Sequence, residues 1–210
     1  MSPTWYATSL IDAPFIKNTH ATPKYTHGDE EYFILNFDIL KLMKPETLIC
    51  NSSNVTYDKG YIALWLDTYD LPETFTCKNL ILHKKDHFHV SLLCVKNILE
   101  TIPDIEDTVL KYFCEFQKHH PVVFTGFTGE YRLAKRDEKM SAVALCEVSN
   151  LHKFAEYLSE KINIEIHHQP AHVTLYTLQP NAGIGLNSKE ELHEKSEPLE
   201  VSAEIRNILI

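Results

Sequence analysis

The sequence predicts an α+β protein with two pseudo-symmetric lobes, each an antiparallel sheet backed by helices. Three observations predict this class. Short runs of β-branched and aromatic residues alternate with turn residues, and two longer stretches carry apolar residues at helical spacing. One pattern, His-Val-hydroxyl-Leu, also occurs twice, at residues 89–92 and 172–175. We therefore expect a central cleft to which both copies contribute.

The N-terminal part of the chain is harder to interpret than the rest. It contains one apolar patch, residues 32–40, whose periodicity fits a strand as well as a short helix. Its aromatic residues are too numerous for a free tail. We expect residues 1–59 to be an N-terminal extension packed on a main fold formed by residues 60–210.

The first half of the main fold is expected to hold strands followed by a helical stretch. Residues 61–67 and 79–82 have the composition of strands, and residues 88–93 form the first motif strand. Residues 95–120 carry apolar residues near helical spacing, with a break at Pro103. Little room is left for a helix before the first motif strand.

The second half is expected to repeat this plan with one helix more. Residues 150–161 predict an amphipathic helix with an asparagine cap, and residues 188–191 resemble a capping box that opens a short helix. Strands are expected at residues 122–127, 129–134, 141–148 and 171–176, with a closing strand at 199–205.

Each copy of the repeated pattern places an imidazole and a hydroxyl on one face of a strand. Successive side chains point to opposite faces, so His89 and Ser91 share one face while the aliphatic residues between and after them share the other. His172 and Thr174 repeat this arrangement. The other histidines of the chain show no comparable repetition, which favours a functional role over two incidental sheet histidines.

The paired motifs resemble the signature of the 2H phosphoesterase superfamily, which includes 2′,3′-cyclic phosphodiesterases and LigT-like RNA enzymes. The resemblance covers residues 60–210. It implies a phosphodiesterase that needs no metal or other cofactor, with His89 and His172 as catalytic residues and Ser91 and Thr174 as phosphate-binding residues. The small space before the first motif strand departs from the longer family members and is similar to the shorter cyclic phosphodiesterases.

The chemistry of such a reaction explains the residue types. Opening a phosphodiester with water needs a base for the attacking water and an acid for the departing ribose oxygen, and histidine serves both roles near neutral pH. Hydroxyls beside the imidazoles can donate hydrogen bonds to phosphate oxygens whose charge grows in the transition state. The sequence does not assign which histidine is the base.

Charge limits the substrate classes. A formal net charge of −9 disfavours binding along an extended nucleic-acid backbone, since such binding depends on many contacts from lysine and arginine to phosphate. We expect a small nucleotide or an RNA end as the ligand. The choice stays open among nucleoside 2′,3′-cyclic phosphates, RNA ends, 2′-5′-linked oligoadenylates, cyclic signalling nucleotides and ADP-ribose cyclic phosphate.

Aromatic and basic residues near the motifs are further candidates for substrate contact. Tyr176 lies two residues beyond Thr174, and Trp65 lies on a neighbouring strand, so both are candidates for stacking on a base. Arg132, Lys135 and Arg136 form the most basic local cluster, which fits a solvated hairpin tip better than a phosphate site.

Two alternatives stay open. A histidine-rich metal-dependent hydrolase would use ligands from two segments, 83–89 and 167–172, although it leaves the shared hydroxyl and leucine of the motifs unexplained. A non-catalytic module would keep the fold to bind a nucleotide, although both motifs are intact.

The cysteines and the apolar runs indicate the cellular setting. The five cysteines are widely spaced and contain no Cys-x-x-Cys pair, which predicts reduced thiols in a cytoplasmic protein. No apolar run approaches membrane-spanning length, and the first residues lack the pattern of a signal peptide, so no membrane association is expected. The oligomeric state is not predicted.

Overall fold

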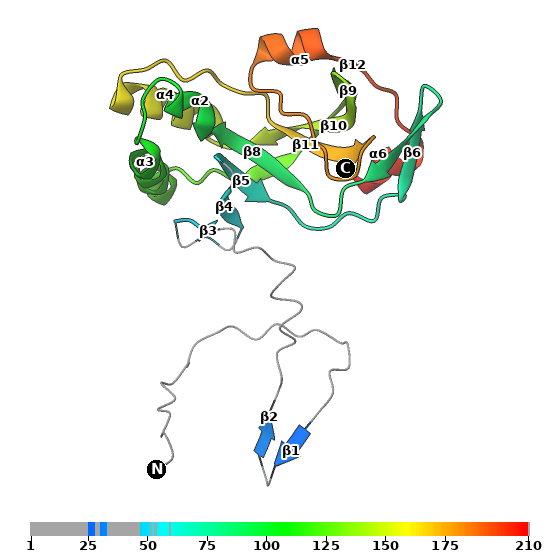
Figure 1. Cartoon of the computed structure of the whole chain (residues 1–210), viewed down its shortest axis with the longest axis horizontal. Helices are drawn as coiled ribbons and strands as arrows, with labels where there is room; N and C mark the ends of the chain where they lie inside the picture. Colours follow the sequence, from blue (N-terminus) through cyan, green and yellow to red (C-terminus); the bar gives the residue numbers. More distant parts are fainter. Residues whose placement is uncertain are drawn as a thin grey trace. The chain divides into compact units, whose positions relative to one another are not determined.

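Figure 1 shows the computed structural model of the chain, which describes residues 25–27, 30–32, 47–50, 52, 54–58 and 60–209. The chain divides into two compact units, Met1–Pro45 and Glu46–Ile210. In the first unit, β1 (Tyr25–His27) and β2 (Glu30–Tyr32) form an antiparallel pair. The predicted apolar patch lies outside the described residues except for Tyr32.

The second unit is built on one antiparallel sheet of ten strands, with the order β12-β9-β10-β11-β8-β5-β4-β3 and a β6–β7 hairpin attached through β7 to β11. The α+β class is confirmed. The two motif strands, β8 and β11, are neighbours near the middle of this sheet. The strands are β3 (Thr47–Leu48), β4 (Val55–Asp58), β5 (Tyr61–Trp65), β6 (Thr74–Cys77), β7 (Leu80–Lys84), β8 (His89–Cys94), β9 (Phe124–Arg136), β10 (Lys139–Val148), β11 (His172–Thr177) and β12 (Ser196–Pro198).

The helices confirm most of the predicted pattern. The expected break divides the long helical stretch into α2 and α3, and Ser188 caps α5 by accepting a hydrogen bond from the Glu191 amide. No helix in the described part of the chain is long and apolar enough to cross a membrane. The helices are α2 (Val95–Leu99), α3 (Glu106–His119), α4 (Leu151–Ile162), α5 (Lys189–Lys195) and α6 (Ala203–Ile208).

Three predictions of secondary structure differ from the structure. The strands expected at residues 122–127 and 129–134 form one continuous strand, β9. The closing strand expected at residues 199–205 is wrong, because the last strand, β12, ends at Pro198 and α6 begins at Ala203. Ser202 caps this helix by accepting a hydrogen bond from the Ile205 amide. Asn150 precedes α4 as predicted, but its side chain donates to the Pro121 carbonyl rather than capping the helix.

The sheet separates two apolar layers. On one face, α3 and α4 pack together through Phe113 and Phe154, whose ring centroids are 5.0 Å apart, and they bury the aliphatic residues of both motif strands. On the other face, Ile184 and Leu186 cover Val143 of β10. In Figure 1, α3 and α4 lie together at the left and α5 lies at the top.

The compact unit begins earlier than the sequence indicates. Strands β3 and β4 pair with each other, and β4 pairs along its whole length with β5. Val55 is buried in the main core. The sheet therefore includes part of the expected extension, and the boundary falls at Glu46 rather than at Gly60.

A disulfide joins Cys50, in the loop before β4, to Cys114 in α3. The prediction of reduced thiols is wrong for these two residues, whereas Cys77, Cys94 and Cys146 are free. The partners are 64 residues apart in sequence and their Cα atoms 4.8 Å apart, a proximity that only the tertiary fold creates. A bridge that closes a long loop typically stabilises a protein by about 2–4 kcal/mol.

Candidate active site

The register of the two motif strands decides how their side chains meet. β8 and β11 are antiparallel, and Val90 lies opposite Val173. Both valines are fully buried in the main core, on the face covered by α3 and α4. The residues on either side of each valine therefore point to the opposite face of the sheet.

This register gathers the motif residues into one group, called here the four-residue cluster: His89, Ser91, His172 and Thr174. His89 lies opposite Thr174, and Ser91 lies opposite His172. Side chains directly opposite have Cβ atoms about 4.5–5.5 Å apart, and diagonal neighbours such as the two histidines roughly 7–8 Å. That separation fits two imidazoles on either side of one phosphate.

Both motif strands carry an irregularity directly after the hydroxyl residue. In β8, Ser91 lies opposite Ala63, but Leu93 lies opposite Ile62, so Leu92 is an extra residue. The alternation of faces shifts by one residue at such a bulge. Leu92 and Leu93 are consequently both buried in the main core.

The irregularity in β11 turns the side chain of Tyr176 to the face opposite the one predicted. Thr174 lies opposite Val143, but Tyr176 lies opposite Ala142, so Leu175 is the extra residue. Tyr176 is 1% exposed, and its ring packs against Phe75 in the main core. Burial raises the pKa of its hydroxyl to about 12. The structure does not bring Tyr176 to the four-residue cluster.

Trp65, in contrast, adjoins the cluster. It lies opposite His89 on β5, with ring centroids 5.0 Å apart. The exposed ring of His87 meets the indole edge-on, with ring centroids 6.2 Å apart. The indole Nε1–H donates to the Thr56 hydroxyl at 2.8 Å, which fixes the ring. Trp65 therefore forms an ordered aromatic surface beside one imidazole.

His172 is held in one orientation. Its side chain is largely buried, and its Nδ1 lies 2.8 Å from the Pro170 carbonyl, to which it donates. The neutral ring therefore carries its lone pair on Nε2. Burial lowers the pKa of His172, and the hydrogen bond to Pro170 opposes this in part.

His89 has a still less favourable environment for charge. Burial, followed by the charges of Lys85 and His172, lowers its pKa to about 4. Its Nδ1 is buried and has no hydrogen-bond partner among the described residues. Both imidazoles are therefore neutral near pH 7 in the free protein, and both offer a lone pair to a proton.

These pKa values predict that acid weakens the fold. A histidine with a lowered pKa in the folded state binds more protons when unfolded, so its contribution is lost as pH falls from about 6.5 to about 4. For His89 the loss is about 3 kcal/mol at most. Urea unfolding at pH 7 and pH 4.5 should show a smaller decrease for His89→Gln than for the wild type. Equal decreases would contradict this account.

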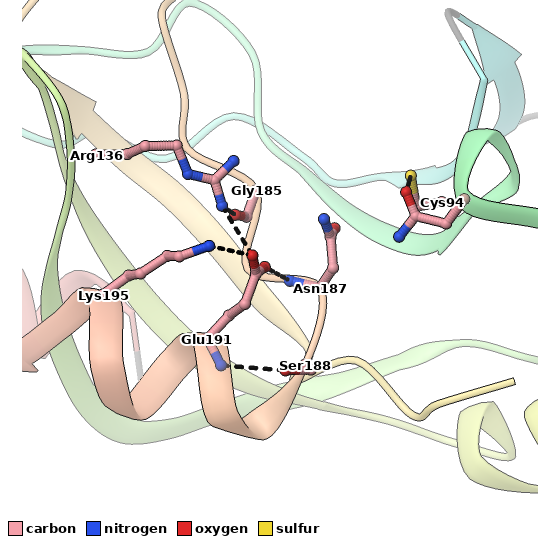
Figure 2. A network of polar contacts seen from close by, with 8 residues as sticks. Cys94, Arg136, Gly185, Asn187, Ser188, Glu191 and Lys195 are labelled. Carbon is pink, nitrogen blue, oxygen red and sulfur yellow. Dashed lines mark hydrogen bonds and ion pairs between the residues drawn. The ribbon is translucent and has the colours of Figure 1, made fainter. Parts of the chain in front are cut away.

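One segment lies along the four-residue cluster and ends in α5. A side chain built on Gly183 would place its Cβ 3.7 Å from the Thr174 hydroxyl. Figure 2 shows how the far end of this segment is fixed: Glu191 accepts a hydrogen bond from the Asn187 amide and forms ion pairs with Arg136 and Lys195. The segment is thus anchored to β9 across the sheet face.

The basic cluster around Arg132 has structural partners. Arg132 donates to the Ser196 hydroxyl at 2.7 Å and to the Ser196 carbonyl, and Lys135 pairs with Glu197 at 2.8 Å. Arg136 also donates to the Gly185 carbonyl. These contacts give the three side chains roles in holding β9, β12 and α5 together.

The histidine-rich alternative finds no ligand set in the described residues. There, no three side chains of histidine, cysteine, aspartate or glutamate converge as metal ligands would. His152 and His168 do approach each other, with ring centroids 5.5 Å apart, but no third possible ligand joins them in the described residues. The two segments do meet at His89 and His172, but no third ligand joins these histidines in the described residues.

Sequence reasoning missed Gln169. This residue is 6% exposed, and its amide donates to the Ser91 carbonyl, so it links the approach to β11 with β8. Lys85, which lies near His89, binds the Asn181 side chain at 3.2 Å. Neither residue belongs to a repeated pattern, so no sequence signal distinguished them.

Comparison of the chain with protein-family models, with curated proteins and with solved structures gives no match. The functional argument therefore depends on the geometry of the four-residue cluster and on the chemistry of its side chains.

Proposed function

We propose that the protein is a metal-independent phosphodiesterase of the 2H type, which hydrolyses a cyclic or 2′-linked nucleotide phosphodiester by two-histidine acid/base catalysis. One observation carries the proposal: the register of β8 and β11 brings two imidazoles and two hydroxyls from distant motifs onto one sheet face. A pair of ordinary sheet histidines has no need for matching hydroxyls.

The reaction assigns a task to each member of the cluster. One imidazole takes a proton from water as its oxygen attacks phosphorus, and the other gives a proton to the departing ribose oxygen. Ser91 and Thr174 donate hydrogen bonds to the non-bridging oxygens. Both imidazoles are neutral in the free protein, but an anionic phosphate beside them raises their pKa values and so favours the protonated acid.

The arrangement of the strands supports pseudo-symmetric lobes around a shared cleft. The β4–β5 hairpin precedes β8, and the β9–β10 hairpin precedes β11. Each motif strand pairs with the second strand of its hairpin and has the same irregularity after its hydroxyl residue. The β6–β7 hairpin stands where the second half has α4, in keeping with the little room expected for a helix.

The test is a substrate panel assayed with a chelator present. It comprises nucleoside 2′,3′-cyclic phosphates, 2′-5′ and 3′-5′ dinucleotides, oligonucleotides with cyclic ends, cyclic dinucleotides and ADP-ribose cyclic phosphate. We expect turnover of at least one compound at an undiminished rate in EDTA, with products resolved as 2′- or 3′-phosphates. Binding without turnover would favour the nucleotide-binding module, and activity lost with the chelator would favour the metal-dependent hydrolase.

The cytoplasmic location stays a prediction. The disulfide between Cys50 and Cys114 weighs against it, because such bonds persist chiefly in oxidising compartments. Alkylation of thiols in intact cells, before lysis, distinguishes the two settings: five modified cysteines indicate a reducing environment, and three indicate that the bridge is formed.

A further inference from the structure

A cavity of about 320 Å³ lies beside the four-residue cluster, at the end of β8 that carries Cys94. Apolar walls come from β8, α2 and the segment before β11, including Leu93, Ile98 and Ile166. Polar groups come from the side chains of Asn97, Gln169 and Asn187. Glu165, His167 and Glu191 add titratable groups to the lining. Apolar walls combined with convergent polar groups are a usual form of a small-ligand site.

Three stretches of chain connect this cavity to the cluster. Gln169 lines the cavity, and its amide donates to the Ser91 carbonyl. β8 continues from Ser91 to Cys94, a distance of roughly 10 Å at strand spacing. The segment that passes Thr174 at Gly183 reaches the cavity wall at Asn187. None of the four cluster residues lines the cavity, and β8 places it roughly 10 Å from Ser91, within the reach of a nucleoside attached to a phosphate at the cluster.

The charges of the cavity favour an unphosphorylated group. None of its lining residues is a lysine or arginine, and Glu191 in its wall is already paired with Arg136 and Lys195. A phosphate would meet the carboxylates of Glu165 and Glu191 there, and the one histidine of the lining, His167, already lies 3.7 Å from Glu165. Amide side chains against aliphatic walls instead suit a nucleoside, whose base and sugar present both donors and acceptors.

The cavity and Trp65 lie on different sides of the cluster. Trp65 stands beside His89, which pairs across the strands with Thr174. The cavity adjoins the other cross-strand pair, Ser91 and His172, through Gln169. A phosphate held between the two pairs thus has a binding surface for a base on each side.

We infer that the preferred substrate is a linear phosphodiester with a nucleoside on each side of the phosphate, rather than a mononucleotide with a cyclic phosphate. One base stacks on Trp65, and the second nucleoside enters the cavity. Water forms the new bond to phosphorus, the bond to one ribose oxygen breaks, and that oxygen takes a proton from the acid histidine. The products are a nucleotide and a free nucleoside. This inference rests on the proposed phosphodiesterase function.

The experiment tests the cavity by placing a bulky side chain at its exposed edge. Thr101 lines the cavity and is exposed, whereas the neighbouring Glu100 is exposed but does not line it, so Thr101→Trp has Glu100→Trp as its matched control. Each variant is assayed on a dinucleoside monophosphate and on the 2′,3′-cyclic phosphate of one of its nucleosides. Circular dichroism and the thermal midpoint verify that both variants are folded.

We expect the wild type to show a higher kcat/KM for the dinucleoside monophosphate. Thr101→Trp should raise KM for that substrate by about tenfold or more and leave the cyclic mononucleotide within about twofold, while Glu100→Trp changes neither. A wild-type preference for the cyclic mononucleotide, or equal effects of Thr101→Trp on both substrates, would overturn the inference and leave the proposed function standing. Turnover of no phosphodiester in the panel would overturn both.

Discussion

Replacing His89 or His172 with alanine is expected to lower kcat by about a hundredfold or more on any substrate that the wild type hydrolyses. The two imidazoles lie on neighbouring strands as diagonal neighbours, and each is the sole source of its proton transfer in the proposed reaction. Steady-state kinetics on the best substrate of the panel measures the effect. His152→Ala is the matched control, because His152 is an exposed histidine on α4, outside the cluster.

The double variant separates a catalytic pair from two independent contributions. Residues that act as a unit are non-additive, so the loss for His89→Ala with His172→Ala should fall far below the product of the single losses. The pH profile of kcat/KM should be bell-shaped, since one imidazole must be neutral and the other protonated. Removing the acid histidine should lower kcat least on an activated aryl phosphodiester, because that leaving group needs no proton. The histidine whose variant shows this smaller loss is the acid. A wild-type rate in either single variant would refute the mechanism.

The sequence was most informative where a pattern repeated. The His-x-hydroxyl-Leu motifs, the strands that carry them and the face that each histidine shares with its hydroxyl could be predicted from the sequence, because alternation along a strand is a local property. The sequence did not predict that β8 and β11 are neighbours, because strand pairing depends on contacts between distant parts of the chain. The two lobes and their shared cleft were expected from the internal repeat and stay a proposal, while the structure shows that both halves contribute to one continuous sheet.

The misplaced residues have identifiable physical causes. Tyr176 was assigned to the site face by strict alternation, but the extra residue Leu175 turns it into the core. Cys50 and Cys114 gave no sign of their bridge, because only the packing of α3 near the β3–β4 loop brings them together. Residues 199–205 alternate as a strand would, but a serine cap and tertiary contacts favour α6. In each case, contacts between residues far apart in the sequence decided the structure, and the local sequence pattern did not.

The hydroxyl pair provides the second large effect. Ser91→Ala and Thr174→Ala should each lower kcat by roughly ten- to a thousandfold, as expected when one donor to a developing oxyanion is removed. Both side chains stand on the sheet face of the histidines, and neither has a hydrogen bond within the described structure that the fold would lose, so the thermal midpoint should change little. The effect should appear in kcat more than in KM, because the hydrogen bonds strengthen as charge develops.

Conservative exchanges at the same positions decide whether the hydroxyl itself is responsible. Ser91→Thr and Thr174→Ser keep the donor and alter only a methyl group, and each should retain most of the wild-type kcat. Gly183 leaves space beside Thr174, since a Cβ there would stay 3.7 Å from the hydroxyl, and the serine variant leaves this contact unstrained. If the alanine variants keep wild-type rates, the hydroxyls merely accompany the histidines. If the conservative variants lose as much kcat as the alanine variants, packing around the strands explains the loss, and donation to phosphate does not.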